Sequence, residues 1–161
     1  MPAGSSNQII DPEWLPNCAK DIQAVYRYWK GKAGVRKMPA RADIDPVDLA
    51  PYLSSMLLVD VVPRDNRQEG HTYIYRLVGT REVEMRGHDP TGKPVAGNSL
   101  GHDPEAALRN YRAVVATKEP LLDHTEQLEV YHSLADLDAI FLPLSSDGVN
   151  VDMVLVYTTM N

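Results

Sequence analysis

A seven-residue stretch, GHDPTGK (87–93), contains residue types that phosphate and metal sites use. It fits the pattern G-x-x-x-x-G-K of a phosphate-binding loop, and its first four letters return at 101–104. A working loop of this kind follows a buried strand, opens a helix, and carries Ser or Thr after its Lys to hold magnesium. Here Pro94 follows Lys93, and the preceding residues REVEMR are helix-like. The context therefore argues against nucleotide hydrolysis.

A histidine-aspartate metal site is the second chemistry that GHDP could indicate. Such a site needs several His and Asp ligands that converge at helical spacing. No histidine forms an i, i+4 pair with another ligand on an expected helix; the five are His71, His88, His102, His124 and His132. The Asp-Pro pairs have a simpler explanation, because Asp accepts backbone N–H groups at the start of a helix or turn and Pro fixes φ there. We therefore expect no metal site.

A small hydrolase or lyase using His124, His132 and Asp136 remains as an alternative function. The two histidines are eight residues apart, which is roughly 25 Å on a straight strand at ~3.3 Å per residue. The side chains can converge only if a tight turn lies between them. We accordingly assign no catalytic residue and expect a protein without catalysis of its own.

The bulk composition restricts the partners and the compartment. A length of 161 residues suits one domain. The formal net charge of −6 argues against general binding to nucleic acid or to an anionic membrane. No apolar run approaches the ~20 residues needed to cross a bilayer, and the N-terminus has no signal pattern. Because Cys18 is the one cysteine, an internal disulfide is excluded. We expect a cytoplasmic protein with no room for a second, effector domain.

The N-terminal part is expected to hold a flexible segment, 1–16, followed by a single domain, 17–161, that starts with an amphipathic helix over 18–30. One apolar stripe runs along this helix at helical spacing. The stripe could cover the domain's own core or pack against the same helix of a second copy. We assign it to a dimer or partner surface; its residues are Ile22, Val25, Tyr26 and Trp29.

The rest of the chain alternates strands and helices. Residues 56–62 and 71–79 predict a hairpin of two strands, and a helical turn, TREVEMRG, follows. The clearest helix, 103–118, starts at Asp103 as its cap with proline at the first position. Three more strands are expected at roughly 121–131, 134–144 and 149–158. Strands joined by hairpins form an antiparallel sheet, and helices over one of its faces give an α+β domain.

This order of elements resembles the PAS sensory domain, and in particular a bacterial subfamily of small stand-alone PAS-type proteins of unknown function. Two stretches carry the resemblance: MPARADIDPVDL leading into LLVDVV, and YRLVGTREVEMRGHDPTGK. The resemblance covers about 29–157. It implies a five-stranded antiparallel sheet with a pocket closed by the long helix and the short ones. It further implies a module that binds a small molecule or a protein partner and signals through flanking helices. With the stripe of the first helix as the contact surface, we expect a homodimer.

The cofactors of two PAS branches are not expected here. In the flavin-binding, light-sensing branch the reactive cysteine belongs to a helix after the first two strands, whereas Cys18 precedes all strands. Haem-binding PAS domains typically place a ligand histidine on the long helix, and 103–118 contains none, although His102 lies just outside. We therefore expect neither haem nor flavin.

The candidate ligand-binding residues lie on the second strand, the long helix and the third strand. Buried Tyr and His side chains carry polar atoms that need a partner, which a ligand can supply. The alternative for every one of them is an ordinary core position, and a filled core would make the protein a ligand-free structural adaptor. The candidates are Tyr75, Leu77, Tyr111, Val115, His124 and Leu128.

Overall fold

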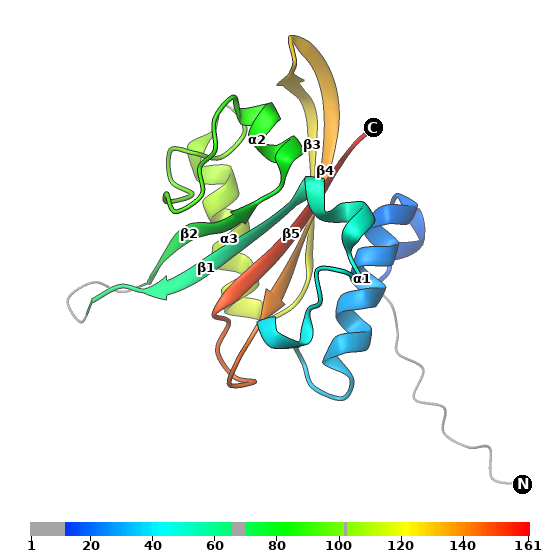
Figure 1. Ribbon diagram of the computed structural model, residues 1–161, viewed down its shortest axis with the longest axis vertical. Coiled ribbons are helices and arrows are strands. Elements are labelled where there is room, and N and C mark those ends of the chain that lie inside the picture. Colours follow the sequence, from blue (N-terminus) through cyan, green and yellow to red (C-terminus); the bar gives the residue numbers. More distant parts are fainter. Residues whose placement is uncertain (1–11, 66–69, 102) are drawn as a thin grey trace, which may run out of the picture.

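The computed structural model describes residues 12–65, 70–101 and 103–161. Its helices are α1 (Lys20–Ala33), α2 (Thr80–Arg86) and α3 (Pro104–Thr117), with a short 3-10 helix, η3 (Ala50–Ser55), before the first strand. The strands are β1 (Met56–Pro63), β2 (His71–Val78), β3 (Leu121–Val130), β4 (Ser133–Leu144) and β5 (Met153–Met160). They form one antiparallel sheet in the order β2-β1-β5-β4-β3 (Figure 1). The expected α+β fold is confirmed.

Both faces of the sheet are covered. Figure 1 shows α2 and α3 on one side and α1 on the other. The alternation along β5 explains this arrangement, because successive side chains of a strand point to opposite faces. Val156 and Thr158 line a cavity beneath α2 and α3, whereas the Tyr157 hydroxyl donates a hydrogen bond to Asp21 of α1. We call the first face the inner face and the second the outer face.

The apolar stripe of α1 belongs to the core of the single chain, which corrects its assignment to a dimer or partner surface. Helix α1 packs against β4 and β5, and its stripe residues, Ile22, Val25, Tyr26 and Trp29, are at most 3% exposed. The Trp29 Nε1–H donates to the Pro143 carbonyl oxygen at 2.8 Å. The strands β4 and β5 bury apolar side chains on both faces, so the outer face requires an apolar cover, and α1 provides it.

The packed part of the chain begins before the expected boundary at residue 17. Residues 1–11 of the expected flexible segment lie outside the described residues. Within 12–16, however, Leu15 is completely buried and Trp14 makes an edge-to-face contact with Tyr26 at 5.6 Å between ring centroids. These two apolar side chains extend the core of α1 toward the N-terminus.

The GHDPTGK stretch is a connector. Gly87 ends α2 in the left-handed conformation that glycine adopts readily, at φ 76°. The Asp89 carboxylate accepts hydrogen bonds from the backbone and the hydroxyl of Thr91, so it closes a turn. Lys93 and Gly92 then pair through backbone hydrogen bonds with Tyr75 of β2. In the second copy, Asp103 caps α3 by accepting from the Glu105 N–H, as predicted.

The junction between β2 and α2 depends on a glycine, Gly79, which has no side chain. A Cβ atom on Gly79 would lie 2.4 Å from the carbonyl oxygens of both Leu53 and Ser54. Glycine therefore lets the start of α2 pack closely against η3, and this contact holds α2 at the end of the inner face. No helix in the described part of the chain has the length and apolarity needed to span a membrane.

Candidate functional site

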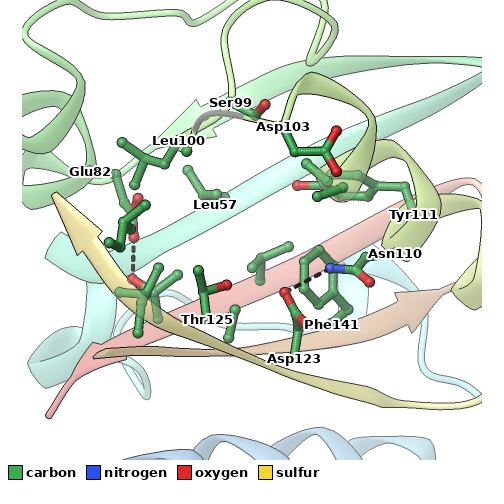
Figure 2. Close-up of a pocket in the computed structure, with 18 of the residues that line it drawn as sticks. Leu57, Glu82, Ser99, Leu100, Asp103, Asn110, Tyr111, Asp123, Thr125 and Phe141 are labelled. Atoms are coloured by element: carbon green, nitrogen blue, oxygen red, sulfur yellow. Dashed lines mark hydrogen bonds between the residues drawn. The ribbon is translucent and has the colours of Figure 1, made fainter. Parts of the chain in front are cut away.

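A cavity of about 250 Å³ lies on the inner face, between the sheet and the helices α2 and α3. Figure 2 shows side chains from all these elements converging on it. Most of its wall is apolar, which is typical of small-molecule sites that use a few polar groups for orientation. The apolar side chains include Leu57, Leu100, Leu128, Leu137, Phe141 and Val156.

A buried ion pair forms one end of the cavity. Glu82 of α2 is completely buried, and the side chain of its partner Arg86 is 5% exposed, with Arg86 Nη1 2.7 Å from Glu82 Oε2. The other Glu82 oxygen accepts a hydrogen bond from the Thr158 hydroxyl. Arg86 also donates to the Tyr75 hydroxyl at 3.3 Å and to the Asn98 carbonyl oxygen at 3.1 Å. A buried charge pair needs such additional partners, and here each charged group has them.

A second polar group lies on the opposite side of the cavity, where α3 approaches β3. The Asn110 amide donates to one carboxylate oxygen of Asp123 at 3.0 Å. Thr125 lies two residues further along β3 and lines the same wall. Figure 2 shows Asp123 and Asn110 joined by this bond, with Tyr111 above them. These side chains surround the part of the cavity that is not closed by α2.

Tyr111 presents a polar atom to the cavity. Its side chain is only 2% exposed, because the ring stacks on Tyr73 and meets the edge of Phe141, with centroids 5.4 and 5.2 Å away. The Tyr111 hydroxyl makes no hydrogen bond to another described residue, and because no fully buried side-chain polar atom of the described residues lacks a partner, this hydroxyl is accessible from the cavity. Burial raises the pKa of Tyr111 well above its ordinary value, and the neighbouring Tyr75 adds to the effect. The hydroxyl is therefore a neutral donor and acceptor aimed into the cavity.

Three of the six sequence-predicted ligand residues line this cavity: Tyr75, Tyr111 and Leu128. Leu77 does not, and its placement corrects the prediction. The register between β1 and β2 shifts, so that Tyr75 pairs with Val59 but Leu77 pairs with Leu58. The extra residue in β2 reverses the alternation. As a result Leu77 points to the outer face and is 53% exposed.

His124 and Val115 also lie outside the cavity. On β3, Asp123 and Thr125 face inward, so the residue between them must face outward. His124 accordingly hydrogen-bonds Asp138 through Nδ1 on the outer side of the sheet edge. Val115 is one turn of α3 beyond Tyr111 and borders a separate surface hollow.

Two of the three residues of the alternative hydrolase already have hydrogen-bond partners, and the third lies in a turn. His124 is paired with Asp138, and Asp136 accepts from the Gln127 backbone N–H at 3.0 Å. His132 lies in the turn between β3 and β4, at φ 63°. In the portion of the chain that is described, no three His, Cys, Asp or Glu side chains are arranged to hold a metal ion.

NMR titration of His124 is expected to give a pKa above its ordinary value of about 6.5, because the Asp138 carboxylate hydrogen-bonds the ring and favours its protonated form. Since the folded state has the higher pKa, this pair stabilises the fold fully below about pH 6.5. The contribution disappears as the pH rises through the folded pKa. Asp138→Asn is expected to lower the pKa, which the ring C–H chemical shifts would report. An unchanged pKa in that variant would contradict the assignment.

Two polar pairs of the cavity were not predicted from the sequence, Glu82–Arg86 and Asn110–Asp123. The first pair has a signal in the sequence, because Glu and Arg four residues apart face the same side of a helix. Nothing in the sequence predicted that this pair is buried, since a short charged helix normally lies in solvent. The second pair joins α3 to β3, and only the tertiary structure brings these residues together.

The described cavity wall lacks the reactive side chains of the two cofactor branches considered from the sequence. Its described residues include neither cysteine nor histidine. Cys18 lies just before α1, where its Sγ donates to the Trp14 carbonyl oxygen. Helix α3 carries no histidine, and His102 lies outside the described residues. A cysteinyl flavin adduct and a haem ligand from α3 therefore have no residue to form them.

The solved structures that match this chain include two proteins of low sequence identity. The LOV protein of Rhodobacter sphaeroides is 14% identical, with a TM-score of 0.45; the match covers 65% of this chain and 58% of that one. The chain thus spans about three fifths of that protein's length. The PAS domain of an HTR-like protein from Haloarcula marismortui is 17% identical, with a TM-score of 0.44, and the match covers 72% of this chain and 91% of that one.

Sequence comparison identifies the family. No curated protein matches the chain. The family model described as PAS domain matches residues 19–157, which include α1, α2, α3 and all but the end of β5. This match extends over most of the sequence and over every cavity-lining residue of the described chain except Thr158, and the chain therefore belongs to the PAS domain family.

Proposed function

We propose that this protein is a sensory or regulatory PAS module that binds a small molecule in the inner-face cavity and has no catalysis of its own. The observation that carries the proposal is the inner-face cavity of about 250 Å³, whose mostly apolar wall presents the Tyr111 hydroxyl as an accessible polar group. This hydroxyl can donate and accept a hydrogen bond, and a bound molecule would supply the partner. A filled structural adaptor would have no reason to keep this hydroxyl.

The proposal includes a second protein chain that receives the signal, a homodimeric assembly and a cytoplasmic location. Strand β5 contacts the cavity on its inner side and helix α1 on its outer side, and this connection supports the transmission of a signal. The cavity touches the inner side of β5 at Val156 and Thr158, while the residue between them, Tyr157, bonds Asp21 of α1. A ligand that shifts β5 would therefore also act on the N-terminal helix.

Native mass spectrometry of the purified protein tests the cavity as a binding site. We expect the wild type to carry additional mass that is released on unfolding. Ala139→Leu should lose that mass, because Ala139 is a buried residue of the cavity wall and a larger side chain would fill the space. The released molecule can then be identified by its mass.

Ala116→Leu is the matched control, since Ala116 is exposed on α3 and is not part of the cavity wall. It should keep the bound molecule. The proposal fails if the wild type carries no small molecule, which would favour the structural adaptor. It fails equally if Ala139→Leu retains the molecule at the wild-type level, because the binding site would then lie elsewhere.

A further inference from the structure

We propose that the ligand of the inner-face cavity is a small organic cation, with an apolar body among the leucines and an ammonium-type group held by Asp123. This inference rests on the proposed function and specifies the class of ligand. It follows from the charges that line the cavity, from the carboxylate oxygen of Asp123 that has no partner among the described residues, and from the Tyr111 hydroxyl in the same wall.

The charged residues of the cavity wall favour a cation. Three carboxylates line it, from Glu82, Asp103 and Asp123, against one guanidinium, from Arg86, whereas the exposed Glu126 carboxylate lies beside His124 on the outer side of the sheet. That guanidinium is fully engaged by Glu82, the Tyr75 hydroxyl and the Asn98 carbonyl oxygen. No free cationic side chain among the described lining residues is therefore available to an anionic ligand. Like charges repel strongly where the dielectric constant is low, so an anion is excluded.

Asp123 is the carboxylate with a free acceptor inside the cavity. Both Glu82 oxygens are occupied, by Arg86 and Thr158. Asp103 caps α3 and pairs with Arg109 at 2.9 Å. Asp123, by contrast, accepts one hydrogen bond within the described chain, from Asn110 to Oδ2. That bond orients the carboxylate and leaves its other oxygen for an N–H donor.

Tyr111 is the independent feature that marks the same place as a binding site. Its buried hydroxyl points into the cavity and can accept a hydrogen bond from an ammonium group. The ring of Tyr111 meets that of Phe141 on the wall next to Asp123. Figure 2 shows Tyr111, Phe141 and Asp123 around one part of the cavity.

The size and shape of the remaining space suit a compact apolar body. A volume of about 250 Å³ corresponds to about eight water molecules at ~30 Å³ each. From the Asp123 end, the wall continues over Leu57, Leu128 and Leu137 toward the ion pair of α2. A phenylalkylamine has this size and this distribution of polarity.

NMR titration of the isotope-labelled chain with three probes of similar size tests the inference. The probes are 2-phenylethylammonium, 2-phenylethanol and phenylacetate, at pH 7 and constant ionic strength. We expect the ammonium to bind most tightly, the alcohol more weakly, and phenylacetate not to bind. In Asp123→Asn the ammonium should bind about tenfold more weakly or worse, because a charge-assisted hydrogen bond is lost. Binding of the alcohol to this variant should be unchanged, which also shows that the cavity is intact.

Glu129→Gln is the control, because Glu129 is an exposed carboxylate of β3 outside the cavity wall. It should leave the preference for the ammonium unchanged. Equal affinities for the ammonium and the alcohol, or an unchanged ammonium affinity in Asp123→Asn, would overturn the cation preference while the cavity remains a binding site. Tightest binding of phenylacetate, or binding of none of the probes, would also overturn it. The native mass spectrum decides the proposed function separately.

Discussion

Arg86→Met is expected to lower the free energy of unfolding by about 3–5 kcal/mol, the usual cost of removing one partner from a buried ion pair. The variant would leave the completely buried Glu82 with the Thr158 hydroxyl as its remaining side-chain partner. It would also remove the donor of the Tyr75 hydroxyl. Denaturant unfolding monitored by circular dichroism gives the value. We expect the side chains at the α2 end of the cavity to become less ordered in the same variant.

A double variant distinguishes the contribution of the whole ion pair to stability from the cost of leaving one charge unpaired. Glu82→Leu combined with Arg86→Met replaces both charges by apolar groups of similar size, and such replacements are often neutral or stabilising. Its stability should therefore lie well above that of Arg86→Met alone. Arg81→Met, at an exposed position of the same helix, should stay within about 0.5 kcal/mol of wild type. Equal losses from Arg81→Met and Arg86→Met would disprove the role of the buried pair.

Trp29→Ala is expected to cost about 3–5 kcal/mol of unfolding free energy, as large aromatic truncations in a core do. Trp29 is 2% exposed between α1 and the outer face, and its indole N–H bonds the Pro143 carbonyl oxygen. Trp29→Phe keeps most of the packing and removes this donor, so its cost should be smaller, about 1–3 kcal/mol. Thermal and denaturant unfolding of the two variants provides the comparison.

Trp14→Ala is the matched control for this residue type. Trp14 is only partly buried and contacts Tyr26 by its edge, so we expect a smaller loss than for Trp29→Ala. Light scattering should give Trp29→Phe the same molar mass as wild type. If Trp29→Phe instead changed the molar mass without loss of stability, Trp29 would lie on an interface between chains, contrary to its burial in this fold.

The elements themselves were largely predictable from local patterns. The strand predicted at 56–62 is β1, at Met56–Pro63, and the helix predicted at 103–118 is α3, at Pro104–Thr117. Helical and strand periodicities and the Asp103 cap depend on residues that are close in the chain, so they predict the elements of the folded structure. The last strand begins at Met153 instead of 149, because Asp147 accepts backbone N–H bonds from Val149 and Asn150 and closes a longer turn.

The candidate site was predictable only in part. Tyr75 and Tyr111 were placed correctly from their strand and helix periodicities, because no irregularity precedes them in those elements. The prediction that Leu77 lines the cavity was wrong because the register of β2 shifts by one residue after Tyr75. A bulge is set by the pairing of two strands, and a single strand's alternation does not reveal it.

The sequence by itself determined that this chain forms an antiparallel α+β domain, because periodicity, caps and turn residues act locally and agree with one another, and its resemblance to PAS domains indicated the family. Only the tertiary structure decided which apolar stripe is core and which polar groups meet. The α1 stripe is buried because the outer face of β4 and β5 needs a cover. Asn110 and Asp123 meet because α3 crosses the sheet beside β3. Contacts between elements distant in the chain depend on their packing, and that packing creates the cavity.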